Sequence, residues 1–97
     1  MVYAASKGGI VSMSRGLARS FAPSGVRVNV VSPGAANTSM MWQGMTEESM
    51  ADFVSMIPIG RLAEPDELAG AVMYLASDAS SFVTGALINV SGGQLMY

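Results

Sequence analysis

A short valine-rich segment places the strongest limit on what this chain can fold into. Residues 26–32 contain four valines, and between positions 28 and 31 the only polar residue is Asn29. A strand of this composition is expected to be buried on both faces, as strands are in parallel sheets covered by helices. The sequence therefore predicts a strand of an α/β fold here, ended by Pro33 and Gly34.

The segments around this strand predict the other elements. Residues 2–22 repeat apolar side chains at steps of three and four, which gives a helix with one apolar stripe. The stripe consists of Ile10, Met13, Leu17 and Phe21. Another helix is expected from Pro65 to about Ser77, and a second strand over residues 86–90. A helix followed by a buried strand is half of a βαβ crossover, so we expect an α/β fold with two parallel strands and three to four helices.

Small residues recur at every fourth position of the first predicted helix. They are Ala4, Gly8, Ser12, Gly16 and Ser20. A glycine inside a helix costs roughly 1 kcal/mol relative to alanine, so its repeated use there usually has a packing reason. Two explanations stay open: packing against another part of the same chain, or contact with a second subunit.

The least regular segment, residues 35–57, is rich in methionine. Methionine side chains fill irregular apolar space, so core packing is the first interpretation of this segment. Within it, Thr46 is a plausible N-cap for a short helix that starts with two glutamates. Further along, Arg61 is expected to form an ion pair or to cap a carbonyl group rather than to bind substrate.

Composition limits the possible partners. Apolar residues make up 51% of the chain and charged residues 12%, against about 25% charged in a typical domain. The chain therefore carries more apolar surface than a domain of this size needs, which predicts burial against something outside it. The net charge of −2 and five basic residues argue against nucleic acid. With no cysteine, no secretory pattern and no apolar run of about 20 residues, we expect a cytoplasmic protein that does not bind membranes.

The first predicted helix begins with a tyrosine and a lysine four residues apart, Tyr3 and Lys7. Side chains at this spacing share one helical face. A free tyrosine has a pKa of about 10, and lowering that pKa to about 7 takes ~4 kcal/mol. One cation at ~4 Å, at an effective dielectric constant of about 20, supplies energy of that order. The pair is thus chemically sufficient for proton transfer near pH 7, although Tyr-x-x-x-Lys also occurs by chance on solvated helices.

Several linked motifs in this chain resemble the short-chain dehydrogenase/reductase family. They are Tyr3–Gly9, Arg27–Gly34 with Thr38, Gly60–Glu67 and Gly85–Gly93. They cover nearly the whole chain in the order and at the spacings of the family. The resemblance implies the C-terminal part of a Rossmann-like doubly wound parallel sheet. It also implies an NAD- or NADP-dependent oxidoreductase that interconverts an alcohol and a ketone by hydride transfer, and a homo-oligomer.

The resemblance also implies which residues would act. Tyr3 would exchange a proton with the substrate oxygen, while Lys7 would lower the tyrosine pKa; both would contact the cofactor, Lys7 through the nicotinamide ribose. The segment that holds the nicotinamide and its carboxamide is matched by Pro33, Gly34, Ala36 and Thr38. The methionine-rich segment would be a mobile lid that selects the substrate. Ser91 stands where the family usually has an aspartate, which puts one hydrogen bond or charge in doubt.

Features of the N-terminal half of the family have no counterpart in these 97 residues. No G-x-G-x-x-G phosphate loop can be drawn, and the active-site serine and asparagine of the family lie upstream of the tyrosine. We therefore expect residues 1–97 to form a single partial domain that does not catalyse the reaction by itself. Its expected partner is the missing N-terminal half or a full-length relative. The alternative is a non-catalytic association module, or an inactive remnant, that docks on such a relative.

Overall fold

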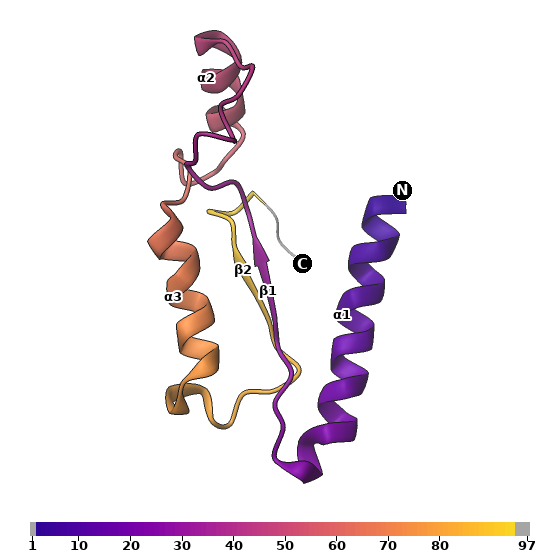
Figure 1. Cartoon of the computed structure of the whole chain (residues 1–97). Helices are drawn as coiled ribbons and strands as arrows, with labels where there is room; N and C mark the ends of the chain where they lie inside the picture. The colour runs from indigo at the N-terminus through magenta and orange to yellow at the C-terminus, as the bar shows by residue number, and fades with distance from the viewer. Residues whose placement is uncertain (1, 95–97) are drawn as a thin grey trace.

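The computed structural model of the chain describes the backbone of residues 2–94 and the side chains of residues 5–94. Three α-helices and a two-stranded parallel sheet make up this part of the chain (Figure 1). In chain order the elements are α1 (Val2–Phe21), β1 (Val30–Pro33), α2 (Glu47–Ser55), α3 (Pro65–Ala76) and β2 (Leu87–Val90), with 3-10 turns at Ala22–Ser24 and Asp78–Ser80. The predicted α/β fold, with its two parallel strands, is confirmed.

The sheet lies between two helices (Figure 1). β1 pairs with β2 in a register that sets Val30 opposite Leu87 and Ser32 opposite Asn89. Because side chains alternate along a strand and register partners share a face, these four side chains project to one side of the sheet. That side faces α1, and the opposite side, which includes Val31, faces α3. The α3 helix is the crossover that connects the two parallel strands.

β1 is shorter and less buried than the sequence predicts. It starts at Val30 rather than at residue 26 because the preceding residues pair irregularly with the chain before β2. The carbonyl of Val28 accepts from the Gly85 amide at 2.8 Å, but the Val28 amide donates to the side-chain oxygen of Thr84 at 3.1 Å. Val30 and Val31 are only half-buried. The expectation that both faces of this strand are buried is therefore wrong for these residues, because the described helices cover the two faces only in part.

The apolar core of the described residues is small. Its buried members are Ala18, Ile57 and Leu62. The α1 helix presents Ser14 and Ala18 as buried residues, whereas its predicted apolar stripe is 39–59% exposed at Leu17, Phe21, Ile10 and Met13. A side-chain carbon added at any of the three glycines of α1 would meet no atom within 4 Å. Packing against the described part of the same chain therefore does not explain the small residues at Gly8 and Gly16.

The methionine-rich segment contains the predicted short helix and little core. Thr46 caps α2 as expected: its hydroxyl accepts from the Ser49 amide at 3.1 Å, and the Ser49 hydroxyl accepts from the Thr46 amide at 2.9 Å. Met40 is 80% exposed and Met56 is 63% exposed, so the core interpretation is wrong for these two side chains. Within the described residues, no helix is both long enough and apolar enough to cross a membrane.

Candidate functional site

The start of α1 and the carboxyl end of β1 lie at the same end of the molecule (Figure 1). Ligands of open α/β sheets bind at the carboxyl ends of the strands, so this end is the place to look for a site. The backbone of Tyr3 belongs to the first turn of α1, one helical turn before Lys7. The side chain of Tyr3 lies outside the described residues, and the predicted contact between its phenol and Lys7 stays a prediction.

Lys7 lies over the end of β1. Its side chain is half-buried, and it lines a cavity of about 210 Å³ between α1 and the sheet. Across the cavity from the helix are Val30, Val31 and Ser32. Most of the lining is apolar, so a charge or a hydroxyl group inside it interacts in a medium less polar than water. The structure thus brings Lys7 together with Ser32, the residue directly before the predicted cofactor-binding turn.

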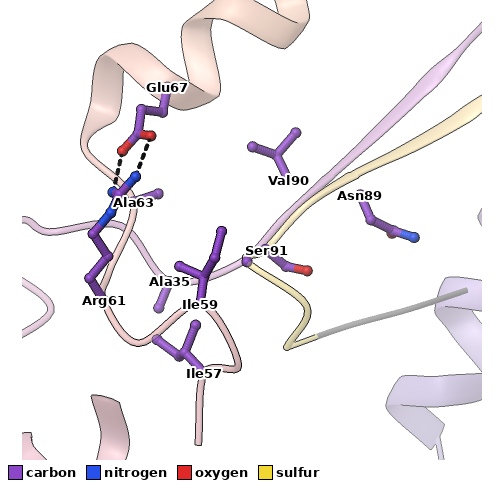
Figure 2. A pocket seen from close by; sticks show the side chains of 10 residues that line it. Ala35, Ile57, Ile59, Arg61, Ala63, Glu67, Asn89, Val90 and Ser91 are labelled. Carbon is purple, nitrogen blue, oxygen red and sulfur yellow. Dashed lines mark hydrogen bonds and ion pairs between the residues drawn. The ribbon is translucent and has the colours of Figure 1, made fainter. Parts of the chain in front are cut away.

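Two polar side chains on this face, each with a buried oxygen atom, were missed by the sequence analysis. Ser32 is 5% exposed. Its hydroxyl oxygen and the side-chain oxygen of Asn89 are buried without a hydrogen-bond partner in the described part of the chain. They are register partners in the parallel pair, and Figure 2 shows Asn89 projecting away from its neighbour Val90. The only sequence signal was a polar residue within each apolar strand, which does not tell whether that residue is buried.

The predicted cofactor-binding turn is anchored to β2 and to the residues before α3. The Gly34 amide donates to the Val90 carbonyl at 2.8 Å, and Ala36 pairs with Ala63 in an isolated parallel bridge. Thr38 is exposed, and its hydroxyl accepts from the Met41 amide at 3.3 Å. Residues 33–38 do not line the cavity that contains Lys7, so the structure places them after Ser32 without bringing them into that cavity.

A second cavity, of about 230 Å³, lies between the turn at residues 34–36 and the start of α3 (Figure 2). Its charged groups are paired: the Arg61 guanidinium contacts both carboxylate oxygens of Glu67, at 2.6 and 2.9 Å, and also donates to the Leu62 carbonyl at 3.2 Å. The hydrogen bond from Arg61, helped by the Glu64 amide, lowers the pKa of Glu67 to about 2. This confirms the prediction that Arg61 forms an ion pair and caps a carbonyl group.

No group of three or more His, Cys, Asp or Glu side chains within the described residues is arranged to hold a metal ion. The described groups at this end of the sheet include the Lys7 ammonium, the Ser32 and Thr38 hydroxyls, the Asn89 side-chain amide and main-chain amides. An ammonium and hydroxyls can donate hydrogen bonds to ribose hydroxyls or to an amide oxygen.

Comparisons with known proteins agree on one family. The sequence model described as enoyl-(acyl carrier protein) reductase matches residues 1–94. A cis-4-hydroxycyclohexanecarboxylate dehydrogenase of Sinomonas cyclohexanicum is 46% identical over 91 residues, which cover 94% of this chain and 36% of the relative. The 3-oxoacyl-[acyl-carrier-protein] reductase FabG of Salmonella typhimurium is 42% identical over 94 residues, covering 97% of this chain and 38% of the relative.

The structural comparison gives the same result. The crystal structure of a 3-oxoacyl-[acyl-carrier protein] reductase from Brucella melitensis matches with a TM-score of 0.86 at 39% identity, over 98% of this chain and 35% of that one. The chain spans 36% and 38% of the length of the two curated relatives named above.

Proposed function

Because the chain belongs to the short-chain dehydrogenase/reductase family and shares part of its Rossmann-like fold, we propose that it carries the proton-transfer residues of an NAD(P)-dependent oxidoreductase. The proposed reaction interconverts an alcohol and a ketone. The observation that carries the proposal is the position of Lys7, which lies over the carboxyl end of β1 in a mostly apolar cavity. A cation in such a place favours the ionised form of a neighbouring phenol.

In the proposed mechanism Tyr3 is the acid or base and Lys7 sets its pKa. When the ketone is reduced, the phenol of Tyr3 gives its proton to the substrate oxygen; when the alcohol is oxidised, the phenolate takes that proton back. The ammonium of Lys7, one helical turn away, stabilises the phenolate. The nicotinamide, when bound, supplies or accepts the hydride at the substrate carbon. The two transfers together move one hydride and one proton.

The residues present fit the nicotinamide end of such a cofactor. An ammonium such as that of Lys7 can donate hydrogen bonds to ribose hydroxyls, and the exposed Thr38 hydroxyl can still donate while it accepts from the Met41 amide. Main-chain groups of Pro33, Gly34 and Ala36 would complete the carboxamide contacts. The sequence has no glycine-rich phosphate loop. We therefore propose that residues 1–97 are one part of a cofactor-binding domain. In the relatives, the contacts to the cofactor pyrophosphate would lie in the part of the sequence that this chain does not match.

A complementation experiment tests the proposal. The chain is combined with the segment of Salmonella FabG that precedes the matched region, and NAD(P)H oxidation is followed with a panel of ketones. Tyr3→Phe is expected to lower turnover by at least about 10²-fold, the usual contribution of a general acid–base group. The matched control is Tyr74→Phe, because Tyr74 is an exposed residue of α3 far along the chain from the site. Turnover that survives Tyr3→Phe would end the proposal.

The same complex tests the part assigned to Lys7. In Lys7→Met the ammonium is lost and the phenol of Tyr3 keeps a higher pKa. In this ketone-reduction assay, the pH at which turnover falls because the phenol ionises should therefore move upward, and the KM for the cofactor should increase. Lys7→Arg keeps the charge and should preserve more of the pH profile than Lys7→Met. An identical pH profile in all three proteins would contradict the role of the cation.

One observation favours a second candidate, an association module that docks on a full-length relative. The apolar stripe of α1 is exposed, with Met13 59% and Ile10 50% accessible. An apolar patch of this kind marks a surface that is normally covered. Sedimentation of the isolated chain with a full-length relative would support this candidate if a mixed oligomer of fixed composition forms. A folded monomer in the presence of the relative would count against it.

A further inference from the structure

A side-chain amide links the methionine-rich segment to the start of α3. The side-chain oxygen of Asn37 accepts from the indole nitrogen of Trp42 at 2.8 Å, and its side-chain nitrogen donates to a carboxylate oxygen of Glu64 at 3.3 Å. A donor on one side and an acceptor on the other fix the orientation of the amide, because the oxygen must face the indole and the nitrogen must face the carboxylate. Glu64 is the N-cap residue of α3, so the link ends on a regular element.

The backbone of Asn37 is held independently of its side chain. The Asn37 amide donates to the Ala63 carbonyl at 2.7 Å, and the Ala63 amide donates to the Ala35 carbonyl at 3.1 Å. Removing the side chain of Asn37 therefore leaves these two bonds in place. The indole of Trp42 would lose its acceptor, while the turn that ends at Thr38 would keep its position.

The indole that Asn37 holds forms part of the wall of a depression. This depression has a volume of about 710 Å³, and its lining residues carry no ionisable side chain. They include Trp42, Met50, Val54, Ile57 and Pro58. The depression is shallow and open to solvent, so it can cover one side of a small molecule. An aromatic wall with aliphatic neighbours suits an uncharged hydrocarbon ring or chain, and the lining, whose side chains are apolar except for Ser55, offers no opposite charge to an ionised group.

We propose that Asn37 is a positioning residue that fixes the indole of Trp42 against the start of α3, and that the fixed indole is the wall against which an apolar ring or chain of the substrate packs. The first half of this inference is independent of the reaction. The second half rests on the proposed oxidoreductase function, and it assigns the substrate an uncharged apolar portion.

Fluorescence tests the first half directly, because Trp42 is the only tryptophan of the chain. In the full chain, Asn37→Ala is expected to lower the steady-state anisotropy of Trp42 and to raise its quenching by acrylamide at least twofold. The double variant Asn37→Asp with Glu64→Gln exchanges the amide and the carboxylate, so that both hydrogen bonds can re-form. It should restore the anisotropy of the unchanged chain. Equal anisotropy in the unchanged chain and in Asn37→Ala would overturn the proposal.

A titration with cyclohexanol, followed through Trp42 emission, tests the second half without any turnover. The unchanged chain should show a saturable change, and Asn37→Ala should raise the apparent Kd at least threefold. Glycerol, which is small but polar, is the matched control and should give no saturable change. A linear response to cyclohexanol, or an equal response to glycerol, would overturn the assignment of an apolar site. If turnover survived Tyr3→Phe, the oxidoreductase proposal would fail, but the anisotropy and cyclohexanol results would not change. The failure of the oxidoreductase proposal can therefore be distinguished from the failure of this inference.

Discussion

Gly34 is at a point where a side chain does not fit. A side-chain carbon added there would lie 2.8 Å from both the α-carbon and the β-carbon of Ser91, whereas ordinary carbon contacts are about 3.5–4.0 Å. Because one of these two atoms, the α-carbon, belongs to the backbone of Ser91, the backbone must shift to accommodate the added carbon. We expect Gly34→Ala to lower the free energy of unfolding by about 1–3 kcal/mol, measured from urea unfolding curves.

Gly16→Ala is the matched control for this prediction, since a side-chain carbon at Gly16 would meet no atom within 4 Å. In the interior of α1 this change should stabilise the helix by up to about 1 kcal/mol. Equal effects of the two substitutions would contradict the close approach between Gly34 and Ser91. The result also bears on the site, because the same contact holds the predicted cofactor-binding turn against the end of β2.

The ion pair between Arg61 and Glu67 gives the stability a defined dependence on pH. The pKa of Glu67 is lowered from 4.5 to about 2 by the hydrogen bond from Arg61 and by the Glu64 amide. A carboxyl group whose pKa is lower in the folded state than in the unfolded state stabilises the folded state at every pH above the unfolded-state pKa. This stabilisation is lost as the pH falls through the folded-state pKa. The difference in unfolding free energy between the unchanged chain and Glu67→Gln should therefore be constant above about pH 5 and shrink toward pH 2. A difference that does not change with pH would contradict the assignment.

Arg27 joins the chain before β1 to a segment, residues 75–83, that lies 48–56 residues further along the sequence. Its guanidinium donates to the Leu75 carbonyl at 2.8 Å, to the Ser80 hydroxyl at 3.0 Å and to the Val83 carbonyl at 3.2 Å. It thereby caps the end of α3 and holds the turn that leads into β2. Hydrogen bonds from a charged group contribute about 1.5–3 kcal/mol, and we expect Arg27→Ala to cost that order of stability.

Hydrogen exchange would locate the effect of Arg27→Ala. Amides of residues 80–85 should exchange faster in the variant, because the turn loses its anchor. Arg27→Lys should recover only part of the protection, since an ammonium cannot reach three acceptors with the geometry of a guanidinium. Arg15→Ala, an exposed arginine in the middle of α1, is the control and should leave these amides unchanged.

The helices and strands could be predicted from neighbouring residues in the sequence, whereas the burial of individual side chains could not. The cap at Thr46 and the proline at the start of α3 are signals carried by neighbouring residues, and both predicted the correct helix starts. The start of β1 depends on which backbone groups near Thr84 are available to pair, so the valines alone placed it too early. The same limit applies to the site: Tyr3 and Lys7 were proposed from their spacing and from the family resemblance, and their roles stay a prediction, whereas Ser32 and Asn89 become noticeable only when the register of the strands is known.

The described chain is less compact than a self-contained domain of its length. Its radius of gyration is 15.9 Å, whereas about 13 Å is expected for a compact domain of roughly 100 residues. β1 has one strand neighbour, so its other edge presents unpaired backbone groups. The high apolar content predicted burial against something outside the chain, and the exposed stripe of α1 is the surface that such burial would cover.

This surface leads to a last prediction about association with the complementing segment of FabG. Ile10 is 50% exposed and lines the cavity between α1 and β1, so an apolar group from a partner would contact it. Ile10→Glu would place a charge against that group, and we expect the apparent Kd of the complex to rise at least about tenfold, equivalent to about 1.4 kcal/mol. Ser12→Glu adds the same charge at an exposed position of α1 outside the apolar stripe, and it should leave this Kd within about twofold. If Ser12→Glu weakened the complex as much as Ile10→Glu, the partner would contact the small-residue face instead. The apolar stripe would then need a different explanation.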